Sequence, residues 1–204
     1  QEETFIDRHI IEHVFNWLLE AGIERFYINT SVHREQFPAR YGSRYRDADV
    51  TFVEEQNPYG TGGGIVNLLQ HTTDEYVGGV NGDSLQGFSL SSACTQFEKS
   101  EADFAMVVCP DSSKAVPNSF ANETRELFTA KELKKFGKKE ASKSIGFDTG
   151  IFCGVHFFHR EKTMALLEQN DPPFSIITAL YEELLKKEER VAILTSESCP
   201  EDLG

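Results

Sequence analysis

Apolar strand-like segments alternate with amphipathic helix-like segments through the first half of the chain, and this alternation constrains the fold more than any other feature. Apolar side chains recur at helical spacing over residues 9–21 and stop at Gly22, which predicts a helix. Strands are predicted at residues 25–29, 50–53, 76–80 and 104–109, with helices at residues 34–41, 65–70 and 91–99. Such alternation predicts an α/β fold with a mostly parallel central sheet.

The second half of the chain has longer elements. A β-rich segment is predicted at residues 147–158, helices at residues 161–168 and 175–187, and a last strand at residues 191–194. With 204 residues and 39% hydrophobic content, the chain is long enough to bury one sizeable core. We therefore expect a single domain over residues 1–204.

The net charge and the cysteine spacing limit which binding partners and which cellular compartment the sequence predicts. A net charge of -13 argues against nucleic acid as a partner, because a phosphate backbone is held by many Lys and Arg side chains. The sequence predicts no membrane segment, since it has neither an apolar run of roughly 20 residues nor a signal-peptide pattern. The four cysteines form no C-x-x-C pair, which favours free thiols in a reducing compartment and a cytoplasmic protein.

The sequence Asn81-Gly82-Asp83 directly follows the predicted strand at residues 76–80. Ligands of open α/β sheets bind beyond the carboxyl ends of the strands, so a carboxylate there faces the binding crevice. An Asp oxygen is a suitable ligand for Mg²⁺ held between the protein and a phosphate. The same three residues are also ordinary turn formers, and that alternative stays open.

A second candidate site begins at Glu55 and continues through the glycine-rich run Gly60-Thr61-Gly62-Gly63-Gly64. We expect a turn here before the helix at residues 65–70. Glycines let the backbone approach a flat base or a phosphate, and the N-terminus of the following helix offers unpaired N–H groups. A plain glycine-rich loop is the alternative, because the run has neither the Lys nor the spacing of a P-loop.

A polar stretch between Asp111 and Ser144 carries a cluster of lysines in an otherwise acidic chain. A solvated, mobile excursion is one interpretation of this composition. A lid over an anionic substrate is the other.

Together these motifs resemble the sugar-1-phosphate nucleotidyltransferase family. The resemblance rests on Ile10-Ile11-Glu12-His13, the Glu55 to Gly64 segment, Asn81-Gly82-Asp83, and Asp148-Thr149-Gly150-Ile151-Phe152. It implies a three-layer, Rossmann-like fold of the kind also found in GT-A glycosyltransferases. It also implies transfer of a nucleoside monophosphate from a nucleoside triphosphate to a sugar 1-phosphate, with release of pyrophosphate and with Mg²⁺ as cofactor.

The resemblance assigns roles residue by residue. Asp83 and Asp202 are the expected metal ligands and, with Lys131, the expected catalytic residues. The expected nucleotide-binding residues are Glu55, Gly60, Thr61, Gly62, Gly63, Asn81 and Gly82, and the expected sugar-binding residues are Asp148, Thr149 and Gly150. Three assignments leave alternatives open: Lys131 as a surface lysine, Asp202 as an unordered terminal carboxylate, and Asp148 as a poor substitute for the family's Asn.

The family pattern also implies a strand and a Gly-rich, basic loop before Gln1, and we expect the gene to encode them. A doubly wound sheet without its first strand would leave two strand edges unpaired. Two rival functions remain at this point, a noncatalytic nucleotide-sugar-binding regulator and a GT-A-type glycosyltransferase. The sequence identifies neither the base nor the sugar, and it leaves a homo-oligomer open.

Overall fold

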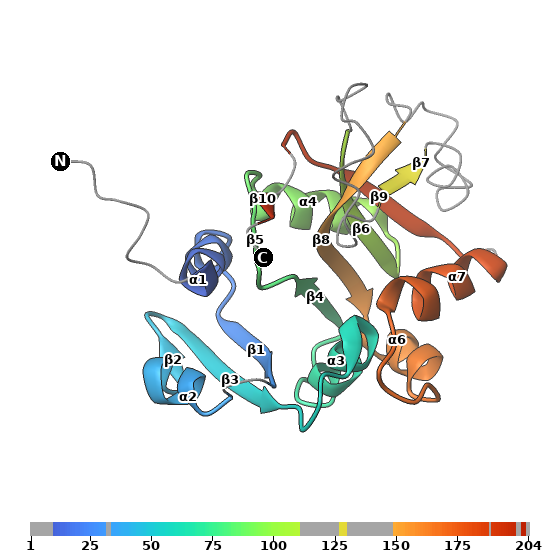
Figure 1. The fold of residues 1–204 in the computed structure, drawn as a ribbon. Helices are drawn as coiled ribbons and strands as arrows, with labels where there is room; N and C mark the ends of the chain where they lie inside the picture. The colour runs from blue at the N-terminus through green and yellow to red at the C-terminus, as the bar shows by residue number, and fades with distance from the viewer. Residues whose placement is uncertain are drawn as a thin grey trace, which may run out of the picture.

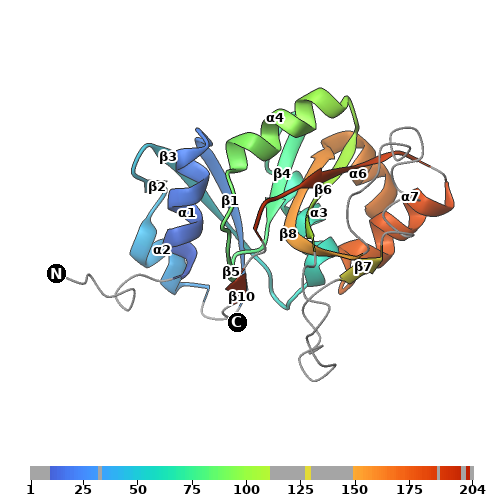
Figure 2. The same cartoon turned by 90° about the horizontal axis from the view of Figure 1, so that it is seen from above.

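The computed structural model describes residues 10–31, 34–110, 127–129, 149–187, 189–198 and 201–202. Helices cover both faces of a strand layer, which gives the three-layer α/β arrangement predicted from the sequence (Figures 1 and 2). None of the helices in these ranges is long and apolar enough to cross a bilayer.

The first part of the chain builds a small sheet beside helix α1 (Ile10–Glu20). The sheet has the order β1-β3-β2, and its strands are β1 (Arg25–Thr30), β2 (Arg44–Tyr45) and β3 (Ala48–Glu54). Helix α2 (Gln36–Tyr41) precedes β2. Phe15 of α1 is 1% exposed and stacks on Phe26 of β1 with ring centroids 5.4 Å apart, so α1 is held against this sheet by aromatic packing.

The second sheet has the order β4-β8-β6-β9, with β7 also pairing with β8. Its strands are β4 (Tyr76–Val80), β6 (Phe104–Pro110), β7 (Leu127–Thr129), β8 (Thr149–His159) and β9 (Val191–Thr195). The run from Phe104 to Cys109 is apolar and buried throughout. Such a run is typical of a strand covered on both faces, and β6 accordingly lies inside the sheet with helices above and below it.

The expectation of a mostly parallel sheet is wrong for the described strands. The pairs β1–β3 and β6–β9 are parallel, whereas β2–β3, β4–β8, β6–β8 and β7–β8 are antiparallel. Strand β8 accounts for most of the difference, because it lies between β4 and β6 and runs against both. A parallel neighbour requires a crossover connection, and alternation of element types in the sequence does not show where the chain instead turns back.

Each face of the second sheet has its own helices. One face packs against α3 (Gly60–Leu69), α6 (Arg160–Leu167), the π-helical turn η3 (Ile177–Tyr181) and α7 (Glu182–Lys186). The other face packs against α4 (Leu90–Ser100) and part of α1. In β6, Met106 faces the first group and Val107 the second, which is the two-residue alternation of a strand between two helical layers.

The expectation of four free thiols is wrong for Cys109. Cys94 and Cys153 keep their thiol groups, and Cys109 is disulfide-bonded. Wide spacing in the sequence does not exclude a disulfide, because the fold decides which cysteines meet. Burial raises the pKa of the Cys153 thiol, which lies 3.6 Å from the Ser196 hydroxyl.

Candidate active site

The turn after β4 carries Asp83 on the surface. The backbone N–H of Asn81 donates to the Gly154 carbonyl at 2.9 Å, and this bond fixes the start of the turn to β8. Gly154 has φ +69, and a Cβ on it would lie 2.8 Å from Nδ2 of Asn81, so only glycine fits there. Asp83 itself is exposed, and its Oδ1 accepts a hydrogen bond from the Ser84 hydroxyl at 3.3 Å.

The far end of the chain returns to this turn. Strand β10 (Glu201–Asp202) pairs antiparallel with β5 (Ser84–Leu85), and Asp202 lies opposite Ser84 (Figure 2). The backbone of Asp202 therefore lies opposite the residue that follows Asp83, although 119 positions separate the two aspartates in the sequence. The side chain of Asp202 lies outside the described atoms, so the shared metal site stays a prediction.

The glycine-rich run is helical, which corrects the predicted boundary. Helix α3 starts at Gly60 rather than near Ile65. Phe174 and its neighbours lie against this helix start: Gly62 N–H donates to the Phe174 carbonyl at 2.9 Å, and Ile176 N–H donates to the Thr61 hydroxyl at 3.0 Å. A side chain on Gly62 would overlap the Phe174 ring. The glycines therefore allow a second chain segment to come close to the helix start. The sequence predicted such a close approach for a nucleotide.

Gly60→Ala and Gly22→Ala form a matched pair that measures this packing. Both glycines have positive φ, +73 and +78, so either alanine costs about 1 kcal/mol in backbone strain. A Cβ on Gly22 meets nothing within 4 Å, whereas one on Gly60 lies 2.6 Å from the Phe174 carbonyl oxygen. We expect Gly60→Ala to lower the free energy of unfolding by roughly 2 kcal/mol in urea denaturation, about twice the Gly22→Ala effect. Equal effects would contradict the close approach of Phe174.

A group of buried polar side chains surrounds the carboxyl ends of β1 and β3, and only one member was predicted from the sequence. Glu55 is 6% exposed, and its Oε2 accepts a hydrogen bond from Tyr59 N–H at 3.0 Å. Its Oε1 has no partner among the described atoms, nor have Asn29 Oδ1 and Thr30 Oγ1. A Cβ on Gly64 would lie 2.6 Å from Asn29 Nδ2 and 3.1 Å from Glu55 Oε1, so these groups lie together. Asn29 and Thr30 are polar residues at the carboxyl end of an apolar strand, much as Asn81 directly follows one, and that signal could have identified them.

The remaining predicted residues fall at the start of β8 or outside the described residues. Thr149 and Gly150 begin β8 and pair with Thr129 and Phe128 of β7. Because Val80 pairs with Val155 and β8 runs against β4, Thr149 and Gly150 lie beyond the carboxyl end of β4, on the side of Asp83. Lys131, Asp148 and the proposed lid at residues 111–144 lie outside the described residues, apart from the three residues of β7.

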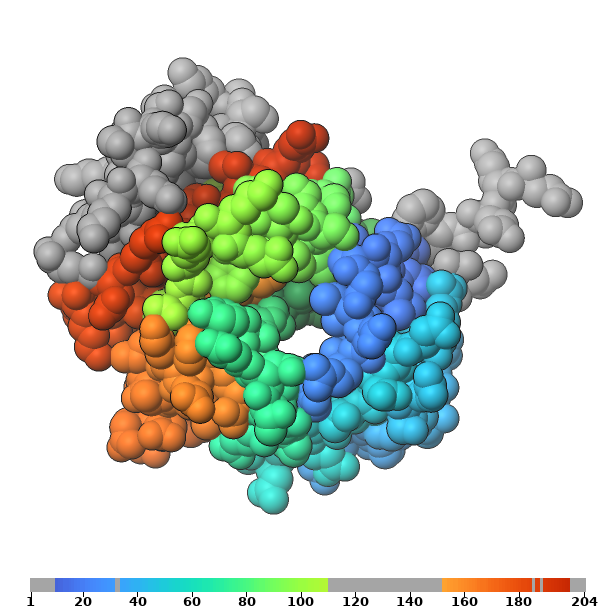
Figure 3. Space-filling view, turned by 180° about the vertical axis from the view of Figure 1, so that it is seen from behind, coloured from blue at the N-terminus to red at the C-terminus, as the bar shows by residue number. Residues whose placement is uncertain are grey.

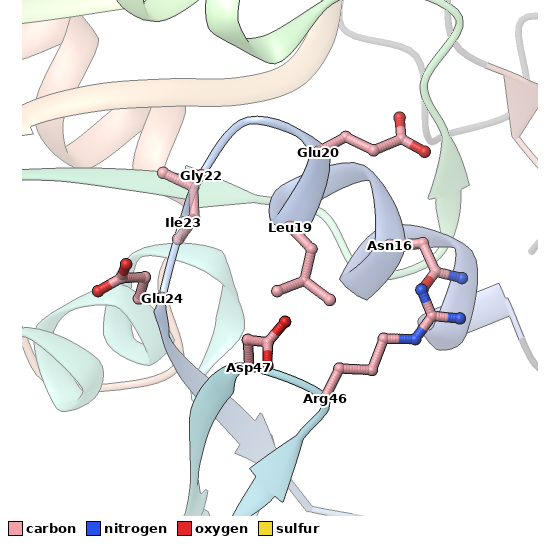
Figure 4. Close-up of a pocket in the computed structure, with 8 residues that line it drawn as sticks. All are labelled: Asn16, Leu19, Glu20, Gly22, Ile23, Glu24, Arg46 and Asp47. Carbon is pink, nitrogen blue, oxygen red and sulfur yellow. The ribbon is translucent and has the colours of Figure 1, made fainter.

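Two hollows border helix α1 in the described part of the chain. The larger, about 980 Å³, lies between β1 and β4 and is lined mainly by apolar side chains of α1, α3 and both strands. The smaller, about 480 Å³, lies between the end of α1 and the β2–β3 turn, where Arg46 and Asp47 project from the turn (Figure 4). None of the predicted nucleotide, sugar or metal residues lines the smaller hollow, so we assign no function to it.

The residue types at the β4–β5 turn fit a hard cation. Asp83 offers a carboxylate that is exposed to solvent, and the β10 backbone brings a second Asp to the same place. No group of three or more potential metal-ligating residues occurs within the described ranges. Mg²⁺ fits such a sparse set, because it usually binds through one or two carboxylates together with waters and substrate phosphates.

Comparison with known proteins identifies the family. The family model described as nucleotidyl transferase matches residues 4–125, which is more than half of the chain. The chain belongs to the nucleotidyl transferase family. The matched range contains the Asn81-Gly82-Asp83 turn, the glycine-rich start of α3 and Glu55.

Two curated members of this family are similar to the chain. A D-glycero-α-D-manno-heptose 1-phosphate guanylyltransferase of Aneurinibacillus thermoaerophilus is 28% identical over 104 residues, covering 51% of this chain and 45% of that protein. A mannose-1-phosphate guanylyltransferase of Mycobacterium tuberculosis is 29% identical over 97 residues, covering 47% of this chain and 27% of that protein. The matches thus span less than half the length of either relative.

Several solved structures share the fold. HddC of Yersinia pseudotuberculosis, crystallised with GMP-PN, superimposes with a TM-score of 0.65 at 14% identity, covering 98% of this chain and 82% of that one. UDP-glucose pyrophosphorylase of Acinetobacter baumanii superimposes with a TM-score of 0.67 at 16% identity, covering 98% and 79%. At such identities the likeness concerns the fold, and it supports the three-layer Rossmann-like arrangement.

Proposed function

We propose that the protein transfers a nucleoside monophosphate from a nucleoside triphosphate to a sugar 1-phosphate, giving a nucleoside diphosphate sugar and pyrophosphate. The observation that carries the proposal is the return of the chain to the β4–β5 turn, which pairs Asp202 with the residue next to Asp83. A nucleotidyl transferase needs negative side chains of this kind where a cation meets phosphate. The guanylyltransferase names of both curated relatives support the same reaction class.

In this proposal each functional residue at the carboxyl edge of the strands has one role. Asp83 and Asp202 would hold Mg²⁺, which when bound neutralises charge on the phosphates. Asn81 and Gly82 set the position of Asp83, because the turn is bonded to β8 at Gly154. Glu55 holds the segment before α3 through Tyr59 N–H, so that the exposed Gly60 and Thr61 are presented at the same edge of the sheet. Positioning and charge neutralisation dominate such transfers, so no covalent role is assigned to the protein.

Three finer statements belong to the same proposal. We infer nucleoside triphosphate and sugar 1-phosphate as the substrates, Lys131 as a contact to phosphate, and Asp148, Thr149 and Gly150 as contacts to the sugar. We also infer a cytoplasmic location, where both substrates would be made. The cysteine spacing no longer argues for this location, because Cys109 is disulfide-bonded.

A substrate screen tests the reaction class directly. The protein is incubated with each of the four nucleoside triphosphates, Mg²⁺ and a panel of sugar 1-phosphates, and pyrophosphate release is measured. We expect release only when one triphosphate and one sugar 1-phosphate are both present. Binding of a nucleotide sugar without any release would favour the noncatalytic regulator, and release of nucleoside diphosphate from a nucleotide sugar would favour the glycosyltransferase.

A further inference from the structure

Two neighbouring residues of β8, Cys153 and Gly154, contact both segments that lead to the candidate metal ligands. They lie just beyond the carboxyl end of β4, because Val80 at that end pairs with Val155. The Gly154 carbonyl accepts the Asn81 N–H that fixes the start of the β4–β5 turn. Cys153 is 1% exposed, and it bonds both to the end of this turn and to the segment before β10.

Gln86 bonds the end of the β4–β5 turn to Cys153. This residue directly follows β5, and its Nε2 donates to the Cys153 carbonyl at 2.9 Å. Two residues further on, the Trp17 indole N–H of α1 donates to the Phe88 carbonyl at 2.7 Å. Because β5 begins one residue after Asp83, the turn that carries Asp83 is held to β8 on both sides.

Ser196 bonds the segment between β9 and β10 to the same cysteine. Ser196 is 6% exposed, and its N–H donates to the Val108 carbonyl at 3.0 Å, which extends the β6–β9 ladder. The Ser196 hydroxyl donates to the Ser198 carbonyl at 2.6 Å and lies 3.6 Å from Cys153 Sγ. A hydroxyl carries one hydrogen, so the Cys153 thiol is the donor in the second contact. Burial raises the pKa of this thiol, which therefore keeps its proton.

Gln96 of α4 fixes the residue before Ser196. Its Nε2 donates to the Thr195 carbonyl and its Oε1 accepts from the Thr195 N–H, each at 3.3 Å. In the space-filling view the red segment that contains β9 runs along the green segment that contains α4 (Figure 3). The amide takes the place of a neighbouring strand at the free edge of β9, whose partner in the described sheet is β6. The chain is thus fixed at two consecutive residues before it continues to β10.

We propose that Gln86 and Ser196 are positioning residues, with Cys153 as their common partner. The first holds β5, beside Asp83, and the second holds the segment that leads to Asp202 in β10. Strands β5 and β10 have two residues each, which is too short for a stable pair without support on both sides. The placement of the two backbones follows from these contacts alone, whereas its use for one shared cation rests on the proposed function.

Hydrogen exchange measured by mass spectrometry tests the positioning without using the reaction. Ser196→Ala removes the hydroxyl with both of its contacts, and Gln86→Met removes the donor at nearly the same side-chain length. We expect each substitution to speed exchange roughly 5-fold or more in peptides that cover β5 and β10, with no change in β1 and β3. Unchanged exchange at β5 and β10, or an equal rise throughout the protein, would overturn the proposal.

Ser100→Ala is the matched control for Ser196→Ala. The Ser100 hydroxyl donates to the Phe97 carbonyl at 2.7 Å, much as the Ser196 hydroxyl donates to the Ser198 carbonyl at 2.6 Å. Ser100 ends α4 and precedes the amino end of β6, whereas the Asp83 turn follows the carboxyl end of β4. We expect the control to leave exchange at β5 and β10 unchanged. An equal rise there in Ser100→Ala would overturn the local role of Ser196.

Binding of Mn²⁺, measured by electron paramagnetic resonance without nucleotide or sugar, separates this proposal from the proposed function. Carboxylate and water ligands suit Mn²⁺ as they suit Mg²⁺. We expect Ser196→Ala and Gln86→Met to weaken binding roughly 10-fold or more, as Asp83→Asn does. Weaker binding in Asp83→Asn alone would overturn the positioning role. If even the unsubstituted protein binds no Mn²⁺, the proposed metal site is contradicted, and hydrogen exchange still decides whether Gln86 and Ser196 hold β5 and β10 together.

Discussion

Asp83→Asn should lower turnover at least ~100-fold without changing the melting temperature. Asp83 is exposed, and its described contact is the hydrogen bond from the Ser84 hydroxyl, which an Asn oxygen can also accept. The substitution therefore removes charge from the proposed metal site with little effect on the fold. Turnover and the melting temperature are measured on the same preparation, because an equal fall in both would indicate damage to the fold.

The partner substitution makes this test specific to one site. Asp202→Asn should have an effect of similar size, and the double variant should lose far less than the product of the two losses, because both residues would serve one ion. Asp49→Asn is the matched control, since Asp49 is also an exposed aspartate but lies near the start of β3, opposite Arg25, with Arg44 3.9 Å away. Strictly multiplicative losses, or a loss in the control, would contradict a shared metal site.

The second large effect is a loss of folding stability at acidic pH, and we expect it to arise from His156. This histidine is 3% exposed, and its Nδ1 lies 2.6 Å from the Tyr181 hydroxyl. Burial lowers the pKa of His156 to about 3 in the folded protein, while the unfolded chain keeps a value near 6.5. Between these two values the unfolded state binds more protons, so stability is complete above about pH 6.5 and falls as the pH drops toward about 3.

The size of this effect follows from the linkage relation. One proton gives a slope of at most ~1.4 kcal/mol per pH unit, or roughly 2 to 3 kcal/mol between pH 6.5 and 4.5. His156→Leu should remove this slope, and Tyr181 can still donate to the Ala105 carbonyl, 3.4 Å from its hydroxyl. Urea denaturation at several pH values measures it. His159→Leu is the control, because the His159 side chain is partly exposed, and an unchanged slope in His156→Leu would refute the assignment.

The element types could be predicted from the sequence because burial imposes a clear periodicity. The strand predicted at residues 76–80 is confirmed as β4, and the helix predicted at residues 91–99 is confirmed within one residue at each end as α4. The start of α3 could not be predicted, because five residues that include four glycines usually indicate a loop. Contacts with Phe174, more than 100 positions away in the sequence, hold them in a helix, and local propensity cannot show such contacts.

Strand direction and the contacts within the buried polar group could not be predicted from the sequence. The reversal at β8 depends on which strands become neighbours, and the two-residue strands β5 and β10 are too short to give a pattern. The Asp202 backbone lies opposite Ser84, next to Asp83, and the shared metal role that the family resemblance implies for the two residues stays a prediction. Asn29 was assigned to a strand but not to a site, because its unpaired oxygen becomes apparent only when Glu55 and Gly64 lie beside it.

Tracing the α-phosphorus tests the central claim most directly. The protein is incubated with Mg²⁺, a sugar 1-phosphate and a nucleoside triphosphate that carries an isotopic label at the α-phosphorus, and the products are separated. Transfer of a nucleoside monophosphate predicts that the label enters a nucleoside diphosphate sugar in amounts equal to the unlabelled pyrophosphate released. Label that remains in free nucleotide while the sugar 1-phosphate is unchanged, under conditions where both substrates are bound, would contradict it.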